Sequence, residues 1–354
     1  MTFELPRDCL TCLVFTHNRP HFLRRLLKFY SKVPPGFSFV VLDSSSPSAA
    51  AENLAAVESS RREFQIEYRH FNTNVWEKCA RGLEQVETPF TVFCADDDLV
   101  FPDAVSRCVD FLLNKPDFVA AMGRTAMLNV RYPHWRKAIK ACSIEHDRPL
   151  DRCRAMASNP FCTFFYAVYR TAALCENLRL TADYEGAMPK HNFGNAMLEQ
   201  LSVLSGRIKV LPQMYSLREH HGANEGAKKP IAVWPEPERN YQLFKACLID
   251  QLVRARASRA EAEQYVDETY GHMRDPNVKI RRPLRSAFEK VRRLVKGVTD
   301  RAADFVWTDE TRHRRFVRSS DVKDCETTWG VATQLMMEFP HGIPLETSTL
   351  KWSA

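Results

Sequence analysis

Four short runs in the first hundred residues predict strands, three of them apolar, and each ends in polar residues that are followed by a helical pattern. They cover residues 10–15, 37–42, 66–70 and 89–95. Pro20 and Pro102 suit the first turn of the helices that follow the first and fourth runs. Strands that alternate with helices predict an α/β fold with a mostly parallel sheet flanked by helices. The carboxyl ends of parallel strands meet at one edge of the sheet, where ligands bind.

The fourth run ends in three consecutive aspartates, Asp96, Asp97 and Asp98. Three adjacent carboxylates repel one another unless a cation neutralises them. A hard divalent ion with phosphate oxygens as further ligands suits that role. The sequence therefore predicts a metal–diphosphate site at the end of this strand.

Further polar residues fall at the ends of the first three predicted strands. They are Thr16, Asn18, Arg19, Asp43, Asn74 and Lys78. Topology predicts that they share an edge with the aspartates, with Asn18 and Asp43 near a sugar or base hydroxyl and Lys78 near phosphate. Each has an ordinary alternative, because Asp and Asn also cap helices or form turns, and a lysine also occupies a solvated helix face.

Three segments resemble the nucleotide-sugar half of GT-A-fold glycosyltransferases, in particular the family 2 group. They are Phe-Thr-His-Asn-Arg-Pro at residues 15–20, Val-Val-Leu-Asp at 40–43 and Cys-Ala-Asp-Asp-Asp at 94–98, and the similarity extends over about residues 8–220. The resemblance implies a nucleoside-diphosphate sugar donor, most often a uridine one, with Mn²⁺ or Mg²⁺ between the diphosphate and the aspartates. The acceptor would be a hydroxyl of a glycan, a lipid-linked molecule or a protein.

The same resemblance implies a role for each matching residue. Thr16 and Arg19 would line the nucleotide pocket, Asp43 the base or ribose, Lys78 the base or diphosphate, and Asp96 the ribose or the metal. Asp98 would bind the metal, and Asp97 would lie in the same pocket without an assigned contact.

Transfer with inversion requires a carboxylate base within hydrogen-bond reach of the acceptor hydroxyl. Relatives carry it in an acidic pair at the start of a helix, and the matching stretch here holds Glu199 followed by Gln200. Asp183 and Glu185, in a predicted polar loop, are alternative bases. Glu199 lies off the apolar face of its predicted helix, so an ordinary surface glutamate is the other interpretation.

Residues 208–215 read as a later strand that leads to Arg218, His220 and His221. In GT-A enzymes a histidine or a basic residue returns near this point, so one histidine would complete the metal coordination and Arg218 would face phosphate. Adjacent residues of an extended segment point in opposite directions, so only one histidine is expected at the metal. Imidazole suits Mn²⁺ better than Mg²⁺. An exposed polar loop is the alternative.

The composition changes beyond residue 230, which predicts a catalytic domain at residues 1–230 and a mainly helical region at 231–354. Residues 279–301 hold nine basic and two acidic side chains, a net charge of +7 that equals that of the whole chain. Apolar residues recur there at helical spacing, so a basic amphipathic helix is expected near residues 280–300. It would lie on an anionic membrane or pack against the catalytic domain. No basic-aromatic pattern accompanies the charge, so nucleic acid is not expected as a partner.

The chain has no apolar run long enough to span a bilayer and no signal-peptide pattern. We therefore expect a cytoplasmic protein, peripheral at the inner face of the membrane if the basic helix binds lipid. Eleven cysteines are spread singly along the chain and are expected to be small core residues.

Other functions fit parts of this pattern. A sugar-nucleotide pyrophosphorylase needs a glycine-rich loop after the first strand, and residues 15–20 contain no glycine. A non-catalytic sugar-nucleotide-binding or membrane-docking protein has little need of three aspartates. Phosphodiester hydrolysis usually draws its acidic ligands from several strands. The sequence favours a metal-dependent glycosyltransferase.

Overall fold

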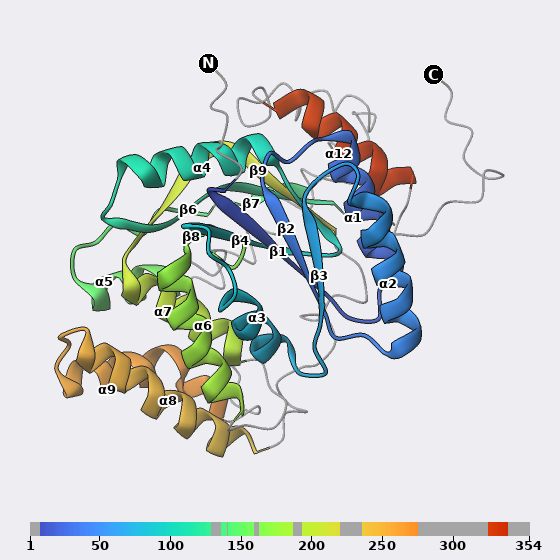
Figure 1. Cartoon of the computed structure of the whole chain (residues 1–354). Helices are drawn as coiled ribbons and strands as arrows, with labels where there is room; N and C mark the ends of the chain where they lie inside the picture. Colours follow the sequence, from blue (N-terminus) through green and yellow to red (C-terminus); the bar gives the residue numbers. More distant parts are fainter. Residues whose placement is uncertain are drawn as a thin grey trace, which may run out of the picture.

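The structure is a computed structural model and describes residues 8–128, 136–139, 141–158, 163–186, 193–219, 236–274 and 325–338. These residues form one mixed sheet of nine strands covered by helices (Figure 1). The strands are β1 (Leu10–Thr16), β2 (Ser38–Asp43), β3 (Ile66–His70), β4 (Phe90–Ala95), β5 (Asp98–Val100), β6 (Phe118–Leu128), β7 (Arg136–Ile139), β8 (Val168–Arg170) and β9 (Arg207–Glu219). Their order is β3-β2-β1-β4-β8-β6-β9-β5, and β7 pairs with β6.

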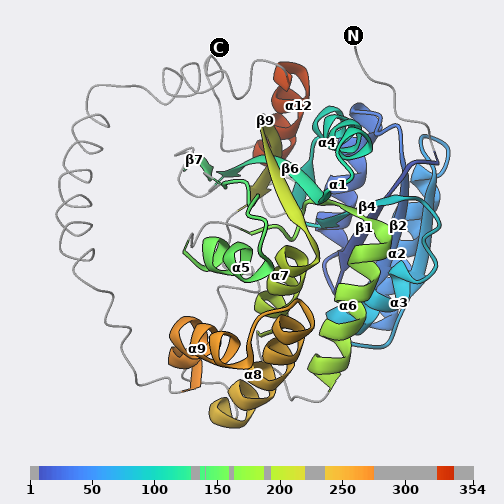
Figure 2. The ribbon, with the colours of Figure 1, turned by 90° about the vertical axis from the view of Figure 1, so that its left-hand side faces the viewer.

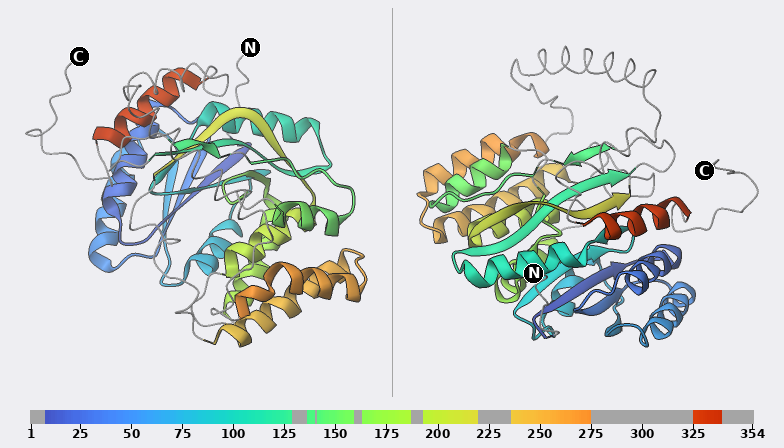
Figure 3. Two further views of the ribbon diagram at one scale, coloured as in Figure 1. Left: turned by 180° about the vertical axis from the view of Figure 1, so that it is seen from behind. Right: turned by 90° about the horizontal axis from the view of Figure 1, so that it is seen from above.

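The helices connect and cover these strands. They are α1 (Pro20–Lys32), α2 (Pro47–Ser60), α3 (Val75–Leu83), α4 (Pro102–Asn114), α5 (Pro149–Ala157), α6 (Thr171–Gly186), α7 (Phe193–Ser205), α8 (Pro237–Arg254), α9 (Arg259–Tyr270) and α12 (Glu326–Glu338), with a 3-10 turn at Gly271–Arg274. Helix α12 lies against α1, as Figures 1 and 3 both show, while α3 packs against α6 and α6 against α7.

The first half of the sheet is parallel, as the alternation of strands and helices predicts. Strands β3, β2, β1 and β4 pair in parallel, and the expected runs match them within two residues. Helices α1 and α4 begin at Pro20 and Pro102, where the sequence placed them. The apolar runs of β1, β2 and β4 are almost entirely buried because helices cover both faces of this part of the sheet. The α/β fold class is confirmed.

The second half of the sheet is mixed. Strand β8 pairs antiparallel with β4 and β6, β5 pairs antiparallel with β9, and β6 and β9 are parallel. The sequence did not predict β5, which begins at Asp98 itself, and the expected run at residues 208–215 is the middle of a longer strand that ends at Glu219. Strand β5 was missed because three residues are too few to show a periodic pattern. The end of β9 was missed because charged residues such as Arg218 and Glu219 are typical of loops unless they have charged partners.

One local prediction was wrong. The polar stretch at residues 181–186, expected to be a loop, is the last part of α6. Before Gly186 this stretch contains neither proline nor glycine, the residues that most strongly disfavour a helix. Arg179 and Asp183 stand four residues apart on the exposed surface and form an ion pair of 3.4 Å, which supports the helix.

The helices near the C-terminal end pack onto the rest of the fold. Figure 2 shows α8 and α9 side by side, close to α5 and α7, and the packing of α8 on α7 and of α9 on α5 supports the view. Trp329 of α12 is 1% exposed and meets Phe101 edge-on, with 6.2 Å between ring centroids. Segment 325–338 therefore completes the core beside α1.

Two predictions about the C-terminal part of the chain stay open. The basic helix near residues 280–300 lies outside the described residues, and the division of the chain into two domains at residue 230 stays a prediction. Among the described helices, none has the length and apolar content needed to cross a bilayer. Cys9 and Cys12 are buried in the core with free thiols.

Candidate functional site

The loops that follow β1 and β2 are tied together by a pair of hydrogen bonds. The backbone N–H of Asn18 donates to Ser45 Oγ at 2.7 Å, and the N–H of Ser46 donates to Asn18 Oδ1 at 2.8 Å. Asn18 has a φ of 55°, a left-handed conformation that asparagine adopts more readily than most residues. Its side chain therefore holds the edge of the sheet together at the point where the sequence predicted a ligand contact.

Asp43 is completely buried below these loops. It accepts hydrogen bonds from Ser45 N at 2.7 Å, from Asn53 Nδ2 at 2.8 Å and from Tyr68 Oη at 2.7 Å. Burial alone would raise the pKa of Asp43, but these hydrogen bonds outweigh it and hold the pKa below its ordinary value. The carboxylate thus fixes the turn after β2 from beneath.

Lys78 lies behind the same loops and is not on a solvated helix face. Its Nζ donates to Thr16 O at 2.8 Å and to Ser44 Oγ at 2.9 Å, and burial lowers its pKa. Asn74, at the start of the same helix, is the N-cap: its Oδ1 accepts from Trp76 N at 2.9 Å. Lys78 therefore stabilises the end of the sheet, while Asn74 caps α3, which is the ordinary role that its residue type allows.

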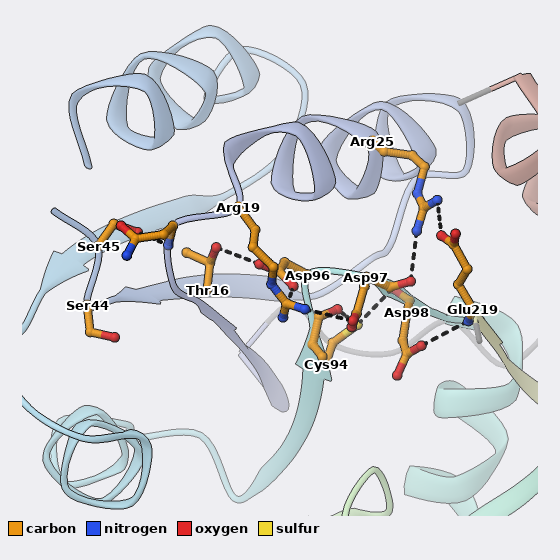
Figure 4. Close-up of polar contacts among 12 residues, drawn as sticks. Thr16, Arg19, Arg25, Ser44, Ser45, Cys94, Asp96, Asp97, Asp98 and Glu219 are labelled. Carbon is orange, nitrogen blue, oxygen red and sulfur yellow. Dashed lines mark hydrogen bonds and ion pairs between the residues drawn. The ribbon is translucent and has the colours of Figure 1, made fainter. Parts of the chain in front are cut away.

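The first two aspartates are paired with β1 and its loop (Figure 4). Thr16 Oγ1 donates to Asp96 Oδ2 at 2.6 Å, and Arg19 Nη2 lies 2.5 Å from Asp96 Oδ1. Arg19 Nη1 donates to Asp97 Oδ2 at 2.9 Å. The structure therefore brings Thr16 and Arg19 to the aspartates across about 80 residues of sequence, as the shared sheet edge predicted.

The third aspartate points to the other side of the cluster. Asp98 Oδ2 accepts from Tyr166 Oη at 2.7 Å and from Arg218 Nε at 3.0 Å, and Asp98 Oδ1 accepts from the backbone N–H of Glu219 at 3.2 Å. Asp98 is only 2% exposed, whereas the Arg218 side chain is 32% exposed. Arg218 thus pairs with Asp98, and its predicted contact with phosphate stays a prediction.

A buried arginine of helix α1 also contacts the cluster. Arg25 Nη2 donates to the carbonyl of Asp97 at 2.8 Å, and Arg25 Nη1 donates to the carboxylate of Glu219 (Figure 4). Positive side chains of the protein therefore face every aspartate of the cluster. Burial still raises the pKa of Asp96 to about 7 and that of Asp98 to about 6, although Arg19 and Arg218 oppose the rise.

A divalent cation would find hard oxygen ligands here but no complete cage. Within the described ranges, no three His, Cys, Asp or Glu side chains form a group able to hold a metal. Asp96 Oδ1 is buried without a hydrogen bond, although it is ion-paired with Arg19. Mg²⁺ is commonly held by one or two carboxylates plus substrate phosphates, so Asp96 and Asp98 fit a cation that binds together with a diphosphate. His220 and His221 lie outside the described residues.

Glu199 is one of the three candidate bases that the sequence predicted. It is partly buried on α7, hydrogen-bonds the Thr163 side chain, and has a pKa that burial raises to about 7. Asp183 is exposed on α6 and paired with Arg179, and Glu185 follows it in the last turn of that helix. Thr163 stands three residues before Tyr166, so one short segment contacts both Glu199 and Asp98.

Four residues of the site were not identified from the sequence: Arg25, Thr163, Tyr166 and Glu219. Arg25 did leave a signal, because it stands three residues after Phe22 and four before Phe29, on the apolar face of its helix. A charge on such a face is expected to have a buried partner. Thr163, Tyr166 and Glu219 have no comparable local pattern.

The comparisons with known proteins agree with this fold. Residues 11–177 match the model of glycosyl transferase family 2. The crystal structure of S. aureus TarS 1-349 superposes with a TM-score of 0.53 at 18% identity over 79% of this chain and 77% of that one. Its complex with UDP-GlcNAc gives a TM-score of 0.54 at 19% identity, covering 77% and 76%. Among curated proteins, none matches the chain significantly. Residues 11–177 therefore form a glycosyltransferase region similar to family 2, and the fold is of the GT-A type.

Proposed function

We propose that this protein transfers a sugar from a nucleoside-diphosphate sugar of the UDP class to an acceptor hydroxyl, with a divalent cation bound alongside the donor. The observation that carries the proposal is the convergence of Asp96, Asp97 and Asp98 with Arg19 and Arg218 at the carboxyl edge of the sheet. The likeness to TarS, whose complex holds UDP-GlcNAc, supports the choice of donor class through the fold.

Two partly exposed cations in this cluster suit a diphosphate. The side chains of Arg19 and Arg218 are 25% and 32% exposed, so both can contact a ligand while they still pair with the aspartates. Asp98, with Asp96, would hold the Mn²⁺ or Mg²⁺ ion. When bound, such an ion stabilises the negative charge that develops on the leaving diphosphate. The edge that receives the nucleotide is formed by Thr16, Asn18, Asp43, Asn74 and Lys78. All of these except Thr16 act through the loop and helix contacts described above.

Glu199 is the base that we propose for the acceptor hydroxyl. A general base works best when its pKa lies near the working pH, and burial places the pKa of Glu199 at about 7. Asp183, by contrast, is exposed and ion-paired with Arg179 on the surface of α6. Removal of the hydroxyl proton by Glu199 as the acceptor oxygen attacks the anomeric carbon corresponds to transfer with inversion.

We propose a glycan, lipid-linked molecule or protein as the acceptor and a cytoplasmic site of action. The basic stretch at residues 279–301, with its net charge of +7, would bring the enzyme to an anionic inner membrane face. Flotation with anionic and neutral liposomes tests this part of the proposal. The intact chain should float with anionic vesicles only, and a full-length variant with the nine basic residues of 279–301 changed to glutamine should not; equal recovery of the two proteins would contradict it.

Thermal shift with a panel of UDP-, GDP- and CDP-sugars, each with and without Mn²⁺, tests the donor class. We expect stabilisation by UDP-sugars that depends on Mn²⁺, because ligand binding to the native state raises its apparent stability. Stabilisation by another nucleotide class would correct the donor, and stabilisation by none would contradict the proposal. Release of free UDP in the presence of acceptor separates the enzyme from a protein that only binds the donor.

A further inference from the structure

Tyr166 is a buried tyrosine whose hydroxyl reaches the aspartate cluster. Its Oη donates to Asp98 Oδ2 at 2.7 Å, and the residue is 7% exposed. Hydrogen bonds to charged acceptors are stronger than those between neutral groups. This strong hydrogen bond therefore holds the Asp98 carboxylate in one orientation.

The segment that carries Tyr166 is itself held at several points. The carbonyl of Tyr166 accepts from Tyr215 Oη at 2.6 Å, and the carbonyl of Phe164 accepts from Tyr169 Oη at 2.9 Å. The ring of Phe165 stacks on Phe93 of β4, with 5.2 Å between centroids. These contacts anchor the segment to β4, β8 and β9, so the phenol of Tyr166 has little freedom to move away from Asp98.

Arg218 shares the same carboxylate oxygen but is held less firmly. Its Nε donates to Asp98 Oδ2 at 3.0 Å, and its guanidinium lies 4.9 Å from the centroid of the Tyr166 ring. With 32% of its side chain exposed, Arg218 is able to turn toward a phosphate. The Tyr166 hydroxyl and the Glu219 N–H would then still hold the two oxygens of Asp98.

We propose that Tyr166 is a positioning residue that holds the Asp98 carboxylate in the orientation in which it receives the divalent cation of the donor complex. This inference rests on the proposed function, because it assumes that Asp98 binds the cation. The phenol also supports the Arg218 guanidinium through its ring, so the cation and the phosphate-facing arginine are placed by one side chain.

Titration calorimetry of Tyr166→Phe tests the inference, since this variant keeps the ring and loses only the hydroxyl. Mn²⁺ is titrated into the protein with saturating UDP, and UDP is titrated separately without metal. We expect Mn²⁺ affinity to fall about tenfold, with metal-free UDP affinity unchanged. Tyr30→Phe is the matched control, because Tyr30 is also buried and its hydroxyl donates to Val100 O of β5 at 3.1 Å. It should bind like the unmodified chain.

The outcomes separate this inference from the proposed function. Equal Mn²⁺ affinity in Tyr166→Phe and the unmodified chain would overturn the positioning role alone. Equal weakening in both tyrosine variants would also overturn it, because a general loosening of the core would then explain the effect. If UDP binding by the unmodified chain does not depend on Mn²⁺, the proposed function fails, and with it the cation for which Asp98 is held.

Discussion

Arg25 of α1 and Glu219 of β9 form a buried ion pair across 194 residues of sequence. The arginine also donates to the Asp97 carbonyl at 2.8 Å, and the Glu219 N–H donates to Asp98 Oδ1 at 3.2 Å. This pair therefore fixes the end of β9 to the aspartate loop. It sets the position from which Arg218, the preceding residue, reaches Asp98.

Replacing Arg25 by methionine should destabilise the fold by about 3–5 kcal/mol, because the buried Glu219 carboxylate would lose its ion pair with Arg25. Chemical denaturation measures the loss. Arg24→Ala is the matched control, since Arg24 pairs with Glu52 at 3.0 Å on the exposed surface and should cost less than about 1 kcal/mol. Similar losses of unfolding free energy in the two variants would show that the buried ion pair stabilises the fold no more than the exposed one.

Asp43→Asn should lower stability at neutral pH by about 1–3 kcal/mol, because an amide cannot accept all three hydrogen bonds of the carboxylate. The folded pKa of Asp43 lies below its ordinary value, so its contribution is present above the unfolded pKa and is lost as pH falls through the folded one. The difference between the variant and the unmodified chain should therefore shrink in acid. Denaturation at pH 7 and near pH 3 checks this, and a difference that stays constant would contradict it.

Glu199→Gln should abolish transfer yet stabilise the fold above pH 7, by about 3 kcal/mol. Burial raises the folded pKa of Glu199 to about 7, so ionisation above that pH costs stability that a neutral amide does not lose. Near pH 4, where the carboxyl is protonated, the gain should vanish. Tyr169 and Tyr270, the titratable neighbours of Glu199, have pKa values that burial raises and stay neutral over this range.

The same residue predicts the pH dependence of activity. Transfer should rise with pH and level off above about 7, as Glu199 loses its proton. Asp183→Asn, a change at the exposed alternative base, is the control and should leave the rate unchanged. Full activity in Glu199→Gln together with loss in Asp183→Asn would move the base to α6.

Trp329→Ala should destabilise the protein by about 3–5 kcal/mol, because the indole is buried against Phe101. Leu113→Ala is a suitable control, since Leu113 is 53% exposed and its change should cost less than about 0.5 kcal/mol. A negligible effect of the tryptophan change would show that segment 325–338 contributes little to the core.

The sequence predicted the parts of this site that lie next to regular elements. Asp96 follows a buried apolar strand and Pro20 opens a helix, so periodicity and helix-start signals were enough to place the sheet edge. Long-range partners left no such pattern. Tyr166 meets Asp98 across 68 residues, in a segment without periodicity, and Glu219 reads as a loop residue until Arg25 is seen beside it. The sequence predicted a metal ion as the neutralising charge for the aspartates. In the structure Arg19 and Arg218 pair with them, and these pairs join residues far apart in the chain.

Calorimetry of UDP binding with Mn²⁺ in Asp98→Asn tests the central claim most directly. Asp103→Asn is the matched control, since Asp103 is an exposed aspartate five residues further along, in the first turn of α4. The account predicts Mn²⁺-dependent UDP binding by the unmodified chain and by Asp103→Asn, and its loss in Asp98→Asn. Undiminished Mn²⁺-dependent binding by Asp98→Asn would contradict it.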